Sequence, residues 1–553
     1  EISVPELGAY EILGTIEGAA EAPALTDLFA TIGLDQSYVV TITDGSVGDI
    51  TTGRGIDVGF HAVGAEIQPF ARRLTIGAPA LGAFDIAGRV LGDPDDLILS
   101  DLSGTVGAEE TIQIDVRSAG VADLNDGTGL AANVALRGSS TQSLGDKFGA
   151  PIPELGAFDL KGFVFGSVDE FSLAEIEGRI GNGSTIGVEV SEGAIYDLNR
   201  GRGIDALVRA RGTEIGALAD VFSADVPRLG AYDLRAHVSG SVDDLTLANL
   251  NGTLGTARTH RFRIEDGRVG NVVDGTGIDA DIHAQGRSVA QVAAIFGSEA
   301  PELGSYDVRG HISGSTAELA VSRLNGTIGT ERALALNVRN GRVANLAKGT
   351  GLKADVVARG GNIADAARIF DIPIYSRGAF RLQTSIAGSL AKPNLDDVDL
   401  AIDLPGAQIR ADGMVRIDDD TLEHFDLIVR AQAQSLERFS PLFGTELPET
   451  ARLSADGRAF GTPEKFSVEN LSARIADSSA RASVALDLSG DVPAIDGSVD
   501  FGRLDPAGVF VSDIGAPASA PVSAGVEDDD LPVWLLEELT GDLRLSVGEL
   551  MLG

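Results

Sequence analysis

The sequence of 553 residues contains no cysteine, two methionines and one tryptophan. The absence of cysteine excludes disulfide bonds, thiolate zinc sites and a cysteine nucleophile. No run of 18 apolar residues occurs, so the sequence predicts no membrane-spanning helix. The first residues, Glu1, Ile2 and Ser3, lack the basic and apolar regions of a signal peptide. We therefore expect any anchor or targeting segment to lie outside this sequence.

Positive charge is also scarce. There are 43 lysines and arginines against 82 aspartates and glutamates, which gives a net charge of −39. Such a surface repels phosphate backbones and anionic lipid headgroups. The composition therefore disfavours nucleic-acid binding and the docking of a basic patch on an acidic membrane. The hydrophobic fraction of 43% is ample for a packed interior.

What the sequence does have is a repeat. A Leu-Gly-x-aromatic tetrapeptide begins at Leu7, Leu81, Leu155, Leu229 and Leu303, and RGAF begins at Arg377, always at intervals of 74 residues. A Gly-x-Gly pair keeps the same register, and the spacing loosens after about residue 377. We divide the chain into the end of a preceding repeat (1–6), five regular repeats (7–80, 81–154, 155–228, 229–302, 303–376), a drifting sixth (377–450), a looser seventh (451–520), and an acidic linker with the start of a further unit (521–553).

Each repeat predicts four antiparallel strands. In the repeat that begins at Leu229, four segments alternate apolar and polar residues, the pattern of a half-buried strand. They start near Tyr232, Leu245, Phe262 and Ile278. The pair Gly275 and Gly277 precedes a strand instead of a helix, so it predicts a hairpin turn and not a phosphate loop.

A short helix is expected after the fourth strand. Val289, Val292 and Phe296 form one narrow apolar stripe at helical spacing, and Ser288 is placed to cap its N-terminus. The last position of this stripe is expected in the core; its occupants in successive repeats are Leu74, Phe148, Phe222, Phe296 and Phe370. The predicted fold class is mainly β: an elongated, curved antiparallel repeat sheet, a β-groove or solenoid, with one short α-helix per repeat.

One face of the predicted sheet is apolar, and one short helix per repeat covers only part of it. Seven units of four strands would extend about 130 Å at about 4.8 Å per strand. An apolar strip of that length needs a partner, and lipid acyl chains are a natural one.

One sequence pattern recurs through most of the chain. It runs PRLGAYDLRAHVSGSVDDLTLANLNGTLG and then GTGIDADIHAQGRSVAQVAAIF, and the end contains DVPAIDGSVDFGRLD and WLLEELTGDLRLSVGELMLG. In this repeated pattern the sequence resembles the AsmA-like family of bacterial envelope proteins, which includes the TamB-like members. It departs from that family in lacking an N-terminal membrane helix and in its strict 74-residue period.

The resemblance implies a periplasmic β-groove that carries phospholipid between the inner and outer membranes of a Gram-negative bacterium, as bridge-like lipid transfer proteins do. It also implies anchoring to the inner membrane by a segment outside this chain. An outer-membrane partner protein is a further expectation, since some family members are implicated in outer-membrane biogenesis.

Two columns of residues are candidates for the lipid-contacting lining. The aromatic column follows the Leu-Gly motif and contains Tyr10, Phe84, Phe158, Tyr232, Tyr306 and Phe380. The third-strand column contains Tyr38, Ile112, Ile186 and Leu334, and its member in the fourth repeat is His260, a polar exception. Val40, Val188, Phe262 and Leu336 lie two residues after positions of this column. For both columns the alternative is a packed core between sheet and helix.

Two other functions fit the repeat. The first is a closed β-solenoid that serves as a spacer or adhesin, which the strict periodicity favours. The second is a scaffold for outer-membrane protein assembly that pairs through a sheet edge. We expect no enzymatic activity, because the polar residues follow the repeat instead of converging on one cleft. We expect no cofactor and no metal.

Overall fold

The computed structural model describes residues 7–33, 35–74, 77–149, 152–167, 170–198, 200–221, 226–256, 258–296, 300–369, 374–418, 421–443, 446–490, 493–509 and 540–551. The chain divides into two compact units. The first contains residues 1–256 and 261–280, and the second contains residues 257–260 and 281–553.

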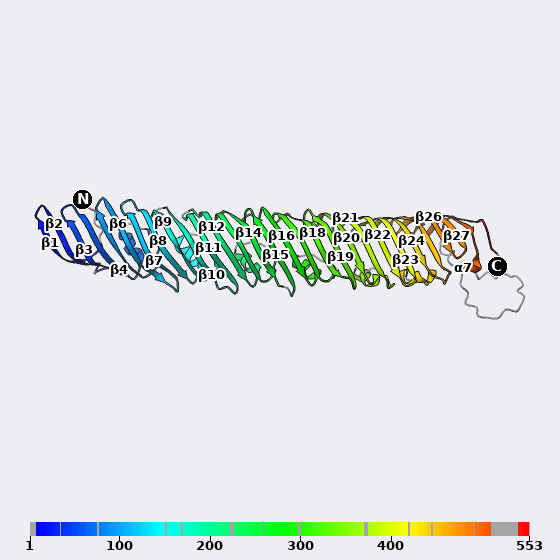
Figure 1. Ribbon diagram of the computed structural model, residues 1–553, viewed down its shortest axis with the longest axis horizontal. Helices are drawn as coiled ribbons and strands as arrows, with labels where there is room; N and C mark the ends of the chain where they lie inside the picture. The colour runs from blue at the N-terminus through cyan, green and yellow to red at the C-terminus, as the bar shows by residue number, and fades with distance from the viewer. Residues whose placement is uncertain are drawn as a thin grey trace. The chain divides into compact units, whose positions relative to one another are not determined.

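In the first unit, successive strands pair antiparallel in chain order (Figure 1). Its strands are β1 (Tyr10–Ala19), β2 (Ala22–Ile32), β3 (Tyr38–Asp49), β4 (Arg54–Gly64), β5 (Phe84–Asp93), β6 (Asp96–Ala108), β7 (Ile112–Asp123), β8 (Thr128–Gly138), β9 (Phe158–Ser167), β10 (Phe171–Gly181), β11 (Ile186–Asp197), β12 (Arg202–Gly212), β13 (Tyr232–Ser241) and β14 (Asp244–Gly255). Its helices are α1 (Ile67–Arg73), α2 (Thr141–Phe148) and α3 (Ile215–Val221). The strands β15 (His260–Val269) and β16 (Ile278–Gly286) each cross the division between the units.

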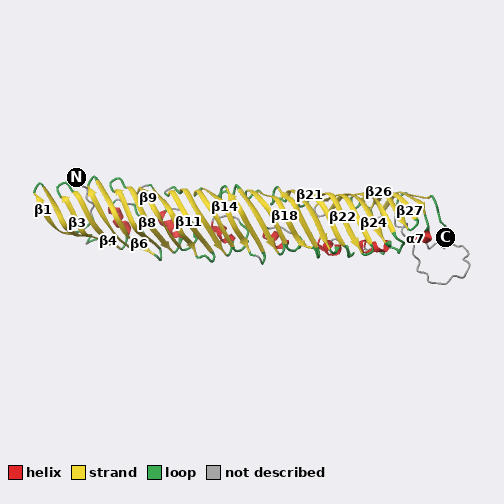
Figure 2. Ribbon diagram, viewed as in Figure 1, coloured by secondary structure: helices red, strands yellow, loops and turns green. Residues whose placement is uncertain are grey.

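The second unit continues the same element order. Its strands are β17 (Tyr306–Gly314), β18 (Leu319–Thr330), β19 (Leu334–Val343), β20 (Thr350–Gly360), β21 (Ala379–Ser389), β22 (Pro393–Leu404), β23 (Ala407–Asp418), β24 (Thr421–Ala433), β25 (Leu453–Gly461), β26 (Lys465–Ile475), β27 (Ser478–Asp487), β28 (Ala494–Arg503) and β29 (Leu543–Val547). Its helices are α4 (Val289–Ile295), α5 (Ile363–Ile369), the 3₁₀ turn η1 (Leu436–Phe439), α6 (Ser440–Phe443) and α7 (Pro506–Val509). The prediction of a mainly β chain with antiparallel strands and few helices is confirmed (Figure 2).

Helices α1 and α5 pack on the apolar face of the sheet in their units, which we call the inner face. In the first unit, Phe70 of α1 lies against Tyr38, Ala62 and Phe84. In the second, Ala366 of α5 lies against Leu334 and Ala358. The opposite, polar face of each sheet is called the outer face. The hydrophobic core therefore lies between the inner face and the short helices.

Glycines and one helix cap behave as the sequence predicts. Both members of each Gly-x-Gly pair have positive φ, for example 61° at Gly275 and 68° at Gly277, as the hairpin turn requires. The Ser288 side chain accepts a hydrogen bond from the Gln291 amide at 3.1 Å and so caps α4.

The second strand of each group of four contains a bulge. Non-glycine residues with φ near 50° recur there at Asp27, Asp101, Glu175, Asn249, Arg323 and Asp397. At Asp101 the register of β6 against β5 shifts by one residue. The bulge moves the following residues so that apolar side chains stay on the inner face along the whole strand.

The end of the second unit departs from the antiparallel order. β29 pairs in parallel with β28, so that Gly497 lies opposite Leu543 and Phe501 opposite Val547. A parallel neighbour needs a connection of a dozen residues or more, and the chain between Leu504 and Thr540 is long enough. The predicted antiparallel sheet does not hold for β29, and residues 521–539 of the segment predicted as an acidic linker and further unit (521–553) lie outside the described residues.

Candidate functional site

Cross-strand register defines rows of side chains on the inner face. In the first unit the row nearest the helices contains Phe84 opposite Val106, and Ile112 and Phe158 on either side of Gly138. Further along the same strands, Val90 lies opposite Leu99, Leu99 opposite Val121, and Val121 opposite Leu130. We call Val90, Leu99, Val121 and Leu130 the far patch, because it lies toward the strand ends remote from the helices.

The far patch lies outside the described cluster of side chains that packs around α1. Side chains packed around Phe70 of α1 include Phe60, Ile86 and Val106, but the described part of that cluster contains no residue of the far patch. Val90, Leu99 and Leu130 are partly exposed, whereas Val121 is buried. Apolar side chains outside the described α1 cluster are therefore continuous across four strands.

The same far position is apolar elsewhere in the chain. In the first unit Val238 lies opposite Leu247, and Leu247 opposite Val269. In the second unit Ile312 lies opposite Val321, and Val321 opposite Val343. The far patch is thus one member of a set that each sheet carries on its inner face.

The predicted aromatic column mostly lies deeper than the far patch. Phe84, Phe158, Tyr232 and Tyr306 are buried, with Phe84 only 4% exposed. Phe380 is partly buried against the cluster around Leu334. Tyr10 differs, because it lies on β1, whose side chains are all exposed, and is itself 69% exposed.

The third-strand column lies in the same layer. Tyr38, Val40, Ile112 and Leu334 are buried. The remaining members are partly buried: Ile186, Val188, Phe262 and Leu336. The structure brings together Tyr38, Val40 and Phe84 beneath Phe70, and Leu334, Leu336 and Phe380 beneath α5. In both groups the side chains fill the space between sheet and helix, and their contact with lipid stays a prediction.

Aromatic stacking supports this packed layer. The rings of Tyr38 and Phe70 have centroids 5.1 Å apart, and those of Phe70 and Phe84 are 5.2 Å apart. The Tyr232 and Tyr306 hydroxyls are buried without a hydrogen-bond partner among the described residues. Burial raises the pKa of both phenols.

The expectation that the last helical stripe position is core is wrong for two of its members. Phe148 ends α2 and Phe296 follows α4, and each is 51% exposed. Each of these helices spans only about two turns, so a seventh-position side chain projects past the packed surface. Leu74 packs against the Phe70 cluster as expected. Phe222 and Phe370 lie outside the described residues.

The outer face carries cross-strand ion pairs. Arg209 donates two hydrogen bonds to Asp233, Nε to Oδ1 at 2.9 Å and Nη2 to Oδ2 at 2.6 Å. This pairing lowers the pKa of the Asp233 carboxyl. His283 Nε2 lies 2.7 Å from Asp307 Oδ1 and lowers the pKa of that carboxyl. Since register places opposite charges side by side, the outer face is hydrated and the inner face is apolar.

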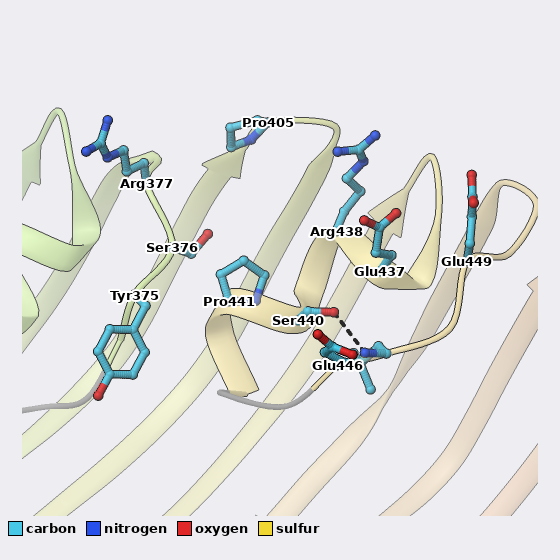
Figure 3. Close-up of a pocket in the computed structure, with 11 residues that line it drawn as sticks. Tyr375, Ser376, Arg377, Pro405, Glu437, Arg438, Ser440, Pro441, Glu446 and Glu449 are labelled. Atoms are coloured by element: carbon cyan, nitrogen blue, oxygen red, sulfur yellow. Dashed lines mark hydrogen bonds between the residues drawn. The ribbon is translucent and has the colours of Figure 1, made fainter. Parts of the chain in front are cut away.

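A cleft of about 650 Å³ lies in the second unit beside η1 and α6 (Figure 3). Arg377 and Arg438 extend to the same side of it, and Tyr375 points the opposite way. The Ser440 hydroxyl accepts a hydrogen bond from the Leu447 amide at 2.9 Å, so it holds the loop. No cluster of three or more His, Asp or Glu suited to a metal ion occurs in the described part of the chain.

Sequence reasoning missed the far patch as a site. Its signal was present, because Leu97 and Leu99 alternate with polar residues in the second strand. Alternation assigns a face, however, and does not say which rows of that face a helix covers. That choice depends on where α1 lies, and the sequence pattern contains no information on it.

No helix within the described ranges is both long and apolar enough to cross a bilayer. Comparison with known proteins gives no assignment: no family model matches the chain, and no significant match was found among curated proteins.

Proposed function

We propose that this chain is the periplasmic groove segment of an AsmA/TamB-like protein and that it conducts phospholipid between the inner and outer membranes. Acyl chains would lie on the inner face, and headgroups would stay in solvent. The observation that carries this proposal is the far patch, a continuous set of apolar side chains that lies outside the described cluster around α1. Such conduction needs a continuous apolar path and no catalytic residue.

Charge distribution supports the same proposal. Ionic residues such as Arg209 and Asp233 lie on the outer face, where they pair with one another. The far patch consists of uncharged apolar side chains, so an acyl chain that left a bilayer for this patch would lose little of its favourable burial free energy. Membrane attachment and an outer-membrane partner protein would be supplied by segments or molecules other than this chain.

Site-specific photocrosslinking tests the proposal at neighbouring residues on opposite faces. Leu99 belongs to the far patch, and Ile98 points to the outer face and is 38% exposed. A photoreactive phenylalanine analogue at 99 is expected to capture phospholipid during expression in a Gram-negative host, and the same analogue at 98 is not. Mass spectrometry of the crosslinked protein identifies the lipid. Equal capture at both positions, or none at 99, contradicts lipid contact on the inner face.

A matched pair of charges tests transfer itself. Leu99→Glu places a carboxylate on the proposed path, and Ile98→Glu places it one residue away on the outer face. Transfer of fluorescent phospholipid between vesicles is expected to fall for Leu99→Glu only, because burying a charge among acyl chains is costly. Equal rates for the two variants would reject the path at this point.

A closed spacer or adhesin is the second candidate function. Burial of the aromatic column favours it, because Phe84 and Tyr232 already pack within the protein. Native mass spectrometry after detergent-free purification separates the two functions: several bound phospholipids per chain support conduction, and a lipid-free soluble chain supports the spacer.

A further inference from the structure

A second cavity in the second unit differs in chemistry from the rest of the molecule. It has a volume of about 690 Å³ and lies where β22–β26 end beside η1. Its charged side chains are Arg452 and Arg474 only. In a chain with a net charge of −39, a cavity lined by arginine without carboxylate is an exception that needs an explanation.

Arg452 and Arg474 differ from two paired arginines on neighbouring strands. Arg430 pairs with Asp412 at 3.0 Å, and Arg458 pairs with Asp426 at 2.6 Å. By contrast, neither Arg452 nor Arg474 forms an ion pair with any described residue. Both are exposed, so their guanidinium groups are free to meet a ligand from solvent.

The other polar lining groups are neutral and can donate hydrogen bonds. Register aligns them across four strands: Gln408 lies opposite Gln432, Gln432 opposite Ser454, and Ser454 opposite Arg474. Gln434 joins them from the turn before η1, where its backbone N–H donates a hydrogen bond to the Gly406 carbonyl at 2.9 Å. The cavity thus offers amide, hydroxyl and guanidinium donors together.

Four charged residues lie near the cavity but do not line it. Arg438 lies next to Gly406, 3.5 Å from the position that a Cβ there would occupy, and so borders the cavity. Asp403 lies opposite Gln408, Asp456 lies two residues beyond Ser454, and Asp477 follows Ala476, but none of the three lines the cavity. Leu404, Ala433 and Leu453 also border the cavity, but their side chains belong to the core cluster on the opposite, inner face.

We propose that this cavity binds a phosphate group. A guanidinium donates two parallel hydrogen bonds to a phosphate. The two guanidinium groups, three side-chain amides and one hydroxyl of the cavity provide more hydrogen-bond donors than the two oxygens of a carboxylate can accept. The donor set therefore favours phosphate over carboxylate. The cavity of about 690 Å³ is larger than phosphate alone, so it has room for an attached organic group. The phosphate is either free or the headgroup of a lipid, and the proposal holds whether or not the inner face conducts lipid.

Calorimetric titration of the full chain tests the site with three probes: inorganic phosphate, monomeric dihexanoylphosphatidic acid, and dihexanoylglycerol, which lacks the phosphate. Arg452→Gln combined with Arg474→Gln is expected to weaken binding of the phosphate-bearing probes by about tenfold or more. The matched control is Arg342→Gln, an exposed arginine on β19 of the same unit, and it is expected to bind within about twofold of the unaltered chain. Circular dichroism checks that all variants fold.

Two further measurements sharpen the test. Ser454→Asp adds a carboxylate to the cavity and is expected to weaken phosphate binding as strongly as the double variant. Raising NaCl from about 0.05 M to about 0.5 M is expected to weaken it too, since the site is open to solvent.

Equal affinity for inorganic phosphate and phosphatidic acid identifies free phosphate as the ligand, and clearly tighter binding of phosphatidic acid identifies the headgroup. The proposal is overturned if neither phosphate-bearing probe binds, if dihexanoylglycerol binds as well as phosphatidic acid, or if the double variant binds like Arg342→Gln.

Discussion

At the scale of single residues, repeat-equivalent positions act as internal controls. The aromatic column is phenylalanine at Phe84 and Phe158 but tyrosine at Tyr232 and Tyr306. Their rings occupy the same buried place beside a glycine, yet the two tyrosine hydroxyls find no partner among the described residues. A buried donor without an acceptor costs about 1–3 kcal/mol.

Tyr306→Phe and Tyr232→Phe are therefore expected to stabilise the protein, each by about 1 kcal/mol, because they remove the hydroxyl and keep the ring. Urea unfolding followed by circular dichroism measures the change. Tyr10→Phe is the control, since Tyr10 is exposed and its hydroxyl is hydrated. A loss of stability in both buried variants would show that the hydroxyls have partners in solution.

At the scale of elements, α1 covers only the nearest rows of the inner face. Seven or eight residues give a regular helix about two turns, enough for a cluster such as that around Phe70 but too little for the strand length. The sheet rows divide accordingly into a packed layer and the far patch. This division separates residues that stabilise the fold from those proposed to meet lipid.

Phe84→Ala is expected to cost about 3–5 kcal/mol of unfolding free energy, because it opens a cavity beneath α1. Tyr10→Ala, at the equivalent position on β1, is expected to cost less than about 1 kcal/mol, because that side chain is already in solvent. Denaturant unfolding of the two variants measures the contrast. Similar costs would mean that burial of Phe84 contributes little to the fold.

At the scale of the whole molecule, a strand at the end of a sheet has an edge whose unpaired backbone groups can bind another chain. β29 covers the edge of β28 by parallel pairing, and its Leu545 side chain is 64% exposed. An uncovered β28 would present a row of free backbone donors and acceptors to another chain.

Removal of residues 540–553 is therefore expected to cause concentration-dependent self-association through β28. Light scattering coupled to size-exclusion chromatography measures the mass over a range of concentrations. Leu545→Lys keeps the strand and is expected to behave like the full chain. If the deletion variant has the same oligomeric state as the full chain at every concentration, the unpaired edge of β28 does not cause self-association.

Sequence by itself determined much of the local structure. Alternation at Tyr232, Leu234 and Val238 assigns β13 and its inner face, and positive φ at Gly275 and Gly277 follows from the hairpin that joins two strands. These features depend on neighbours in the chain, so a period and a turn motif are sufficient to predict them.

Only the tertiary structure decided which apolar residues are covered. Phe148 and Leu74 hold equivalent sequence positions, yet Phe148 projects into solvent and Leu74 packs against Phe70's cluster. The arginine cavity likewise depends on register, which places Ser454 opposite Arg474 and leaves no carboxylate between them. Coverage and charge balance depend on distances between segments remote in sequence, and a repeat pattern does not encode those distances.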